Sequence, residues 1–168
     1  MKKTLAALVV ALVCVPAGLA AREAELPSRG VLTPGVSLAG VHIGDTIAKV
    51  RRTWGPSYKV CQDCEDRVWL YFYSRGEPLG AAVRFDEHDR VVAAFTLGSP
   101  TGWRTAEGLV VGEQIDKVAR VYGSLGWHPC IGYGAMTMRK GNIVTSIYTT
   151  GQVIYGFALT SPKVSVCQ

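Results

Sequence analysis

Hydrophobic and polar positions follow two periods along this chain, a helical one and then a strand-like one, and the order occurs twice. Apolar residues spaced three and four apart predict two short helices, each with one buried face: Ile47, Val50 and Trp54 in the first, and Ile115, Val118 and Tyr122 in the second. Asp45 precedes the first helix as a candidate N-cap. A glycine, Gly55 or Gly123, ends each helix.

Three runs with the alternation of a β-strand follow each predicted helix. They span residues 68–74, 79–85 and 91–97 after the first helix, and 135–139, 143–148 and 152–159 after the second. Short turn sequences separate the runs, so successive runs form hairpins and an antiparallel sheet. The pattern therefore predicts an α+β fold of two αβββ units whose strands join into one sheet, with the helices packed on one face.

The alternation within these strands separates two faces of the sheet. One set is consistently apolar and is expected to meet the helices: Leu70, Phe72, Val83, Phe85, Val91, Ala93, Phe95 and Leu97, then Met136, Met138, Ile143, Ile147, Val153, Tyr155, Phe157 and Leu159. The opposite face keeps rings and arginines: Trp69, Tyr71, Tyr73, Arg84, Arg139 and Tyr148. An open aromatic face is typical of a protein-binding surface. The alternative is that strands simply favour aromatic residues and that a loop or the N-terminal leader covers them.

The residues around the two helices are themselves repeated. Segments 41–55 and 109–123 carry glycine, Ile, Lys, Val, an aromatic residue and a closing glycine in the same order. Such a repeat indicates an internal duplication, which usually builds a continuous surface. We place the first unit at residues 36–100 and the second, with a C-terminal tail, at residues 101–168.

This repeated motif resembles that of a known bacterial envelope superfamily. It runs through residues 40–56, with Gly44, Asp45, Val50 and Trp54-Gly55-Pro56, and returns at residues 108–123. The superfamily contains the β-lactamase inhibitory protein and the small lipoprotein of the outer-membrane barrel-assembly machinery. The chain also looks like uncharacterised exported actinobacterial proteins, over roughly residues 35–159. The resemblance implies αβββ units whose sheet presents a concave aromatic face to a partner protein, and it implies no catalytic residues.

The N-terminal residues have the pattern of a secretory signal. A basic start, Met1-Lys2-Lys3, precedes a short apolar run, and small residues lead up to Ala21. We expect residues 1–20 to be a signal peptide and residues 21–35 a flexible leader. The alternative is lipid attachment at Cys14, which is less favoured because Val13 stands where that processing normally requires a small residue. Either route predicts an extracytoplasmic protein, secreted or periplasmic.

Four cysteines follow the expected cleavage site, and in an exported chain they predict disulfides. The pairing we favour joins Cys61 to Cys64 and Cys130 to Cys167. A link between the two units, from Cys61 to Cys130, is left open because the repeat places these positions within one residue of each other.

The segment Cys61-Gln62-Asp63-Cys64 is also the motif with reactive potential. A dithiol enzyme normally places such a pair at a helix N-terminus, where backbone dipoles stabilise the thiolate. Here strand-like residues follow the pair, and Asp63 and Glu65 oppose thiolate formation. We therefore expect no enzyme activity, no cofactor and no metal site, with an extracytoplasmic thiol–disulfide oxidoreductase using Cys61 and Cys64 as the alternative.

The charge balance narrows the class of partner. The formal net charge is +5, of which Lys2 and Lys3 lie in the expected signal peptide. The small remaining excess, without a dense Lys/Arg run, argues against nucleic acid. We expect a module that binds an extracytoplasmic protein, as an inhibitor or assembly factor, with rings as anchors and arginines that recognise acidic groups: Trp69, Tyr71, Tyr73, Tyr148, Arg84 and Arg139.

Overall fold

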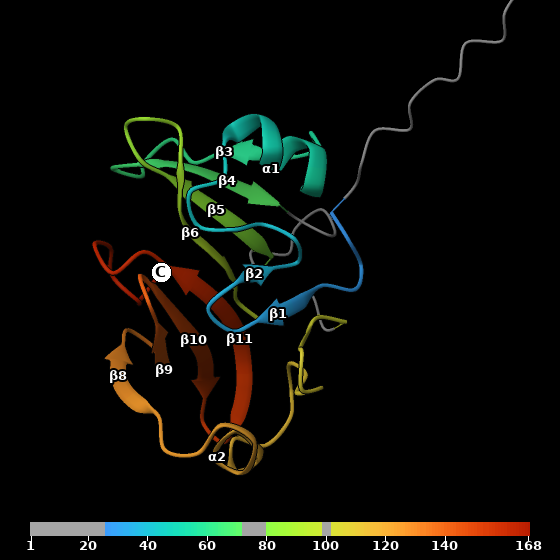
Figure 1. Ribbon diagram of the computed structural model, residues 1–168, viewed down its shortest axis with the longest axis vertical. Coiled ribbons are helices and arrows are strands. Elements are labelled where there is room, and N and C mark those ends of the chain that lie inside the picture. The colour runs from blue at the N-terminus through green and yellow to red at the C-terminus, as the bar shows by residue number, and fades with distance from the viewer. Residues whose placement is uncertain (1–25, 72–79, 99–101) are drawn as a thin grey trace, which may run out of the picture.

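The computed structural model describes residues 26–71, 80–98 and 102–168. In these ranges the chain forms a largely antiparallel α+β fold with two short helices, as the sequence predicts (Figure 1). No helix among the described residues is long and apolar enough to cross a membrane. The expected signal peptide and Tyr73 lie outside the described residues.

One antiparallel sheet of eight strands runs through the whole fold. Its strands, in spatial order, are β3 (Lys59–Val60), β4 (Arg67–Tyr71), β5 (Ala81–Phe85), β6 (Val91–Thr96), β11 (Val153–Thr160), β10 (Ile143–Thr150), β9 (Tyr133–Lys140) and β8 (Gly126–Cys130). The first four strands and the last four meet where β6 pairs with β11, through Phe95 with Ala158, Ala94 with Leu159 and Ala93 with Thr160. The six predicted strands are therefore present, and β3 and β8 extend the sheet at its two edges.

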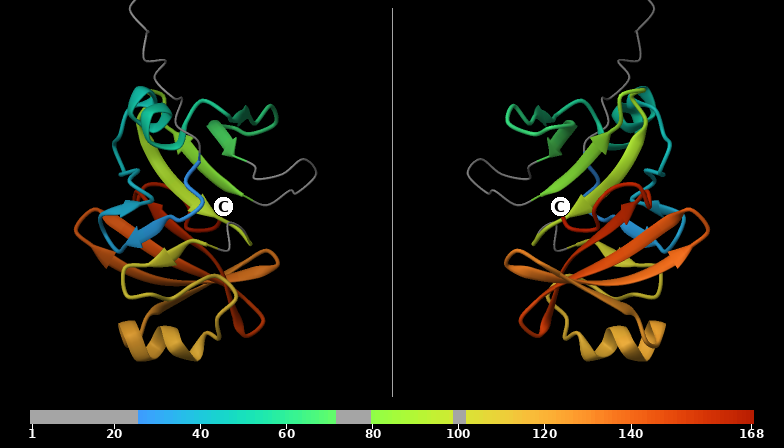
Figure 2. Two further views of the ribbon diagram at one scale, coloured as in Figure 1. Left: turned by 90° about the vertical axis from the view of Figure 1, so that its right-hand side faces the viewer. Right: turned by 90° about the vertical axis from the view of Figure 1, so that its left-hand side faces the viewer.

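Two helices and a small second sheet cover one face of the large sheet. Helix α1 (Ile47–Trp54) lies with the first half of the sheet and α2 (Asp116–Tyr122) with the second, at opposite ends of the molecule (Figure 2). The small sheet has the order β2 (Ser37–Leu38), β1 (Val31–Thr33) and β7 (Arg104–Thr105).

Strand β1 corrects the prediction of a flexible leader over residues 21–35 for residues 26–35, the part of that leader that the structure describes. The side chain of Leu32 is fully buried in the core. The carbonyl of Pro27, just before the strand, accepts a hydrogen bond from the indole N–H of Trp103 over 2.8 Å. The segment around β1 is therefore part of the packed fold, because Leu32 belongs to the same buried cluster as Val50 of α1 and Val118 of α2.

The two helices follow loops with the same hydrogen bonds. Gly44 N donates to Val91 O over 2.8 Å, and Val91 N donates to Asp45 O over 2.9 Å. In the second loop Gly112 N donates to Ile154 O and Ile154 N donates to Glu113 O, over 2.8 and 2.7 Å. Gly44 and Gly112 have φ values of +89° and +92°, a region that favours glycine. These bonds tie each helix to the last strand of its own half.

The side chain of the acidic residue after each glycine accepts a hydrogen bond from the preceding loop, and Glu113 also pairs with Lys117 of α2. An Asp45 carboxylate oxygen accepts a hydrogen bond from His42 N, and Glu113 accepts one from Val110 N. The N-cap of α1 is Thr46, whose hydroxyl accepts from Lys49 N over 3.2 Å. The prediction that Asp45 caps the helix is therefore wrong by one residue, because its side chain is already engaged by the preceding turn.

The main core lies between the helices and the large sheet, and aromatic rings dominate it. The Trp54 ring meets those of Tyr71 and Trp103 edge to face, each at a centroid distance of 5.4 Å. The Trp69 ring stacks on Tyr58 at 3.7 Å. These rings join α1, the sheet and the segment before β7 into one buried cluster.

The predicted exposure of Trp69 and Tyr71 is wrong, since their exposed fractions are 4% and 1%. Trp69 pairs with Val83 and so shares its face, which the sequence correctly placed against the helices. Strand β4 carries apolar residues on both faces, so alternation alone did not identify the inner one. The large rings occupy the wide space beneath α1, and Leu70 takes the outer face.

Two irregularities in the strands overturn the prediction for a second group of residues. The register between β5 and β6 shifts between Arg84 and Phe85, and that between β10 and β11 shifts between Tyr148 and Thr149. A bulge adds one residue to a strand and exchanges its faces from there on. Five residues expected to meet the helices therefore do not belong to the main core, namely Ala93, Phe95, Leu97, Val153 and Tyr155.

The buried position of Trp69 leads to a stability prediction. Replacing Trp69 with alanine removes a ring packed between Tyr58 and Phe85, and we expect a loss of about 3–5 kcal/mol in the free energy of unfolding. The matched control is Trp127→Ala, because that ring is 59% exposed, with an expected loss below about 1 kcal/mol. Urea unfolding followed by circular dichroism measures both, and equal losses would contradict the assignment of the faces.

Candidate functional site

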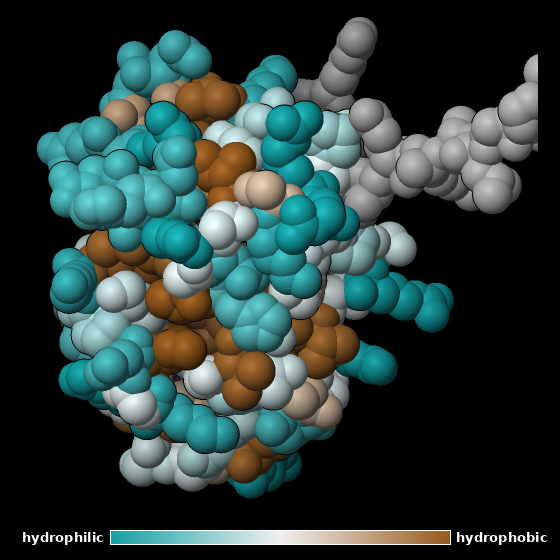
Figure 3. Space-filling view, turned by 45° about the horizontal axis from the view of Figure 1, so that its top comes forward, coloured by the Kyte–Doolittle hydropathy of each residue, from teal (hydrophilic) through white to brown (hydrophobic). Residues whose placement is uncertain are grey.

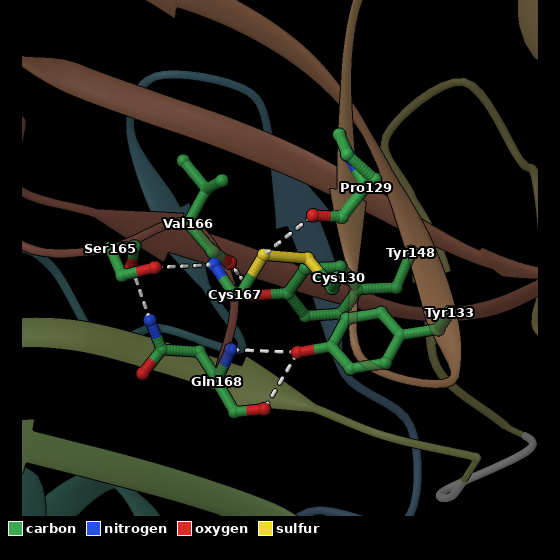
Figure 4. The surroundings of a disulfide bond; sticks show 8 residues. All are labelled: Pro129, Cys130, Tyr133, Tyr148, Ser165, Val166, Cys167 and Gln168. Carbon is green, nitrogen blue, oxygen red and sulfur yellow. Dashed lines mark hydrogen bonds between the residues drawn. A yellow bond between two sulfur atoms is a disulfide. The ribbon is translucent and has the colours of Figure 1, made fainter.

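The C-terminal tail, residues 161–168, crosses the face of the large sheet that is turned away from the helices. Tyr148, on β10, donates a hydrogen bond from its hydroxyl to the carbonyl of Val166 over 2.6 Å (Figure 4). The hydroxyl of Tyr133, on β9, donates to the carbonyl of Gln168 over 2.6 Å and accepts from its N–H over 2.7 Å. A disulfide joins Cys167 to Cys130 at the end of β8.

The tail closes a second, smaller apolar cluster. Ala135, Tyr148 and Ala158 are its fully buried members, with Tyr133, Tyr155 and Val166 among the residues packed around them. Tyr148 therefore lies on the face that the sequence predicts, but its expected exposure is wrong because the tail covers it. The alternative of a covered face is correct for this half of the sheet, with the C-terminal tail as the cover.

A hollow of about 330 Å³ lies on one side of the tail, against the first half of the sheet. Leu70 and Phe95 supply apolar lining, and Arg84 lines it as well. The Arg84 guanidinium forms an ion pair with Asp66, and Glu65 adds a further carboxylate to the lining. The positive charge of Arg84 is therefore already neutralised within the molecule.

A second hollow, of about 370 Å³, lies between the tail and strands β8 to β10. We call it the tail groove; its lining includes His128, Thr137, Arg139, Val144, Val164 and Val166. Arg139 donates from Nε to the carbonyl of Gly141 over 2.9 Å, which fixes its guanidinium. No acidic residue of the described ranges lines this groove or forms an ion pair with Arg139. The two arginines that the sequence singled out thus share a face but lie in different electrostatic settings.

The hairpin of β8 and β9 carries two strongly exposed apolar side chains. Trp127 is 59% exposed, and Ile131, in the turn between the strands, is 99% exposed. The Trp127 ring lies directly over Gly134, where an added Cβ would fall 1.9 Å from the ring. Elsewhere, in the view of Figure 3, apolar side chains reach the surface in small groups separated by hydrophilic ones.

The sequence contains signals for this hairpin that the search for alternating strands passed over. Pro129 has no N–H, which confines a strand that contains it to the edge of a sheet. Ile131 and Gly132 form a two-residue connection between Cys130 and Tyr133, a length typical of tight hairpins. No residue pattern, however, shows that the Trp127 ring stays exposed, because that depends on β8 being an edge strand of the sheet that the described residues form.

The first cysteine pair lies apart from this hairpin. Cys61 and Cys64 form a disulfide in the turn between β3 and β4, and Cys61 N donates to Val68 O over 2.9 Å. The favoured pairing of the four cysteines is confirmed. Neither of the two described helices begins at this pair, so the thiolate stabilisation that a helix N-terminus gives is not supplied here.

Comparisons with known proteins bear on the fold alone. No protein-family model matches this chain, and no curated protein matches it. Its structure is similar to that of a DUF4309 family protein (YjgB) from Bacillus subtilis, with a TM-score of 0.55 and 13% identity over 74% of this chain and 84% of that one. A cysteine-rich secretory protein (SAV1118) from Staphylococcus aureus aligns with a TM-score of 0.49 and 10% identity over 79% of this chain, which spans about half (51%) of that protein. The first likeness shows a shared fold.

The two disulfides are expected to stabilise the protein unequally. Cys130 and Cys167 are 37 positions apart, whereas Cys61 and Cys64 are 3 apart. A longer closed loop restricts the unfolded chain more, so replacing both cysteines of a pair with serine should cost about 4 kcal/mol for the long loop and about 2 kcal/mol for the short one. Urea unfolding of the two double variants measures the difference. A loss for the short loop as large as for the long one would contradict this account of the tail.

The tyrosines beneath the tail predict a loss of stability in alkali. Burial raises the pKa of Tyr148 well above its usual value of 10.0, and burial also raises that of Tyr133. Above pH 10 the unfolded chain therefore releases protons that the folded chain keeps, and the free energy of unfolding falls as pH rises. In Tyr148→Phe this fall should be shallower by up to about 1.4 kcal/mol per pH unit. Urea unfolding between about pH 8 and 11 measures it, and an unchanged slope would show that Tyr148 is exposed.

Proposed function

We propose that this chain is an extracytoplasmic protein-binding module, of the inhibitor or assembly-factor class, and that it holds its partner through the β8–β9 hairpin. The observation that carries the proposal is the exposure of Trp127 and Ile131, 59% and 99%, on one short hairpin. Tryptophan is among the residues that most often dominate the binding energy of protein interfaces. Most of the apolar surface of this pair is not buried by the chain itself, which leaves it available to a partner.

The disulfide beside the turn supports the same proposal. Cys130 directly precedes Ile131, and its bond to Cys167 fixes the end of the hairpin to the tail. Tyr133, two residues after Ile131, is held by two hydrogen bonds to Gln168. A binding loop that is rigid before it meets its partner loses less conformational entropy on binding, and therefore binds more tightly for the same contacts.

These anchors replace those expected from the sequence. Trp69, Tyr71 and Tyr148 are buried and unavailable to a partner without unfolding. Arg84 is paired with Asp66, whereas Arg139 keeps its charge for a partner. The disulfides agree with an oxidising compartment, and with the export that the N-terminal sequence predicts.

We further infer that the chain consists of two αβββ units and belongs with the superfamily of the β-lactamase inhibitory protein. The matching hydrogen bonds at Gly44 and Gly112 support this, because they occur at the same place in the repeated sequence. The order of elements supports it too, since each helix is followed by strands that form one half of the sheet. The last strands of the two halves, β6 and β11, meet at the centre.

Site-specific photocrosslinking in the exporting cells tests the hairpin directly. A photoreactive phenylalanine analogue at position 131 should crosslink to one extracytoplasmic protein, whereas the same analogue at position 121 should not. Val121, on α2, is the matched control because it is an apolar residue that is 41% exposed. Adding Trp127→Ala to the position-131 variant should lower the crosslinked fraction about fivefold or more, since it removes an anchor worth more than 1 kcal/mol.

Two outcomes would contradict the proposal. Equal crosslinking from positions 121 and 131 would show contact without a preferred surface. A crosslink at position 131 that survives Trp127→Ala unchanged would show that the hairpin is near a partner but does not hold it.

A further inference from the structure

We propose that the tail groove binds an extended, acidic segment of the partner protein, with Arg139 as the residue that recognises its carboxylate. This inference rests on the proposed function, because it assigns the chemistry of the partner that the hairpin holds. Three features of the groove carry it: its charge, the alignment of its polar side chains and its position next to the hairpin.

The charge of the groove selects an anion. Its lining among the described residues contains Arg139 and His128 and no carboxylate. The hollow on the other side of the tail differs in this respect, because Asp66 pairs with Arg84 there and Glu65 lies nearby. Since the hydrogen bond to Gly141 O uses Nε of Arg139, the two terminal nitrogens of its guanidinium are left to bind a carboxylate side by side.

The polar residues of the groove lie in line along one face of the sheet. Thr137 and Arg139 are two positions apart on β9, and His128 lies on the same face of the adjacent strand, where it pairs with Ala135. Alternate residues of a strand are about 7 Å apart. An extended peptide has the same spacing between alternate side chains, so it can present acidic groups to Arg139 and its neighbours in register. The tail supplies the apolar wall opposite, with Val164 and Val166.

The groove lies next to the edge strand that we assign to the partner. Strand β8 carries Trp127 on one face and the groove residue His128 on the other, so the two surfaces share one edge of the sheet. A partner that binds around this edge at Trp127 and Ile131 is therefore in reach of the groove. This proximity favours a segment of the same protein over a separate small ligand.

Titration of the full-length, isotope-labelled protein with a capped peptide that alternates glutamate and valine tests the inference. Amide resonances of His128, Arg139, Val144 and Val164 should shift together, and Arg139→Gln should weaken binding about tenfold or more. The matched control is Arg52→Gln on α1, an exposed arginine that should leave binding unchanged. The same peptide with glutamine for glutamate should bind about tenfold more weakly, because a charged hydrogen bond is lost. The amide spectrum of each variant confirms that it is folded.

The outcomes separate this inference from the proposed function. Equal binding of the two peptides, or binding unaffected by Arg139→Gln, overturns the groove assignment, while the crosslink from position 131 decides the hairpin independently. Equal shifts caused by acetate at the same concentration would show a site for small carboxylates and overturn the peptide assignment. Peptide binding in the groove without any crosslink from position 131 would leave the assignment of the groove to an acidic peptide standing. It would also show that the hairpin is not the interface.

Discussion

The fold depends on covering a sheet that is apolar on both faces. The helices and the small sheet close one face over the Trp54 cluster, and the tail closes the middle of the other over Tyr148. Eight residues of tail without regular structure bury little surface by themselves. Two tyrosine hydroxyls and the disulfide between Cys130 and Cys167 therefore hold the tail in place. The tail groove and the β8–β9 hairpin, which we assign to binding, both lie beside this disulfide and these hydrogen bonds.

The tail also decides what the second face can do. It divides that face into two hollows whose charges differ, since Arg84 is paired with Asp66 whereas Arg139 has no ion-pair partner among the described residues. Its disulfide ends at the turn that exposes Ile131. The rigid tail, the unpaired cation and the exposed apolar hairpin thus belong to one region of the molecule, which is the physical basis for treating it as a binding surface.

The sequence predicted the helices and strands because their periodicity is a local signal, whereas it favoured the observed cysteine pairing but left a Cys61–Cys130 link open. Helical spacing located Ile47–Trp54 and Asp116–Tyr122, and alternation located the six long strands. The faces were harder to predict. Strand β4 is apolar on both faces, so alternation did not show that the rings of Trp69 and Tyr71 face inward. On β6 a bulge exchanges the two faces. The exposure of Trp127 depends on β8 being the last strand of the sheet, a property of the topology that no local pattern contains.

The central claim is that the tail lies across the second face in the folded protein, and nuclear Overhauser effects test it most directly. Tyr133 and Tyr148 contact the tail through Gln168 and Val166. We predict strong effects between the Tyr148 ring and the Val166 methyl groups, together with a slowly exchanging Gln168 amide. Their absence, with random-coil shifts over residues 161–168, would contradict the account, because the groove and the fixed hairpin would then both lack their support.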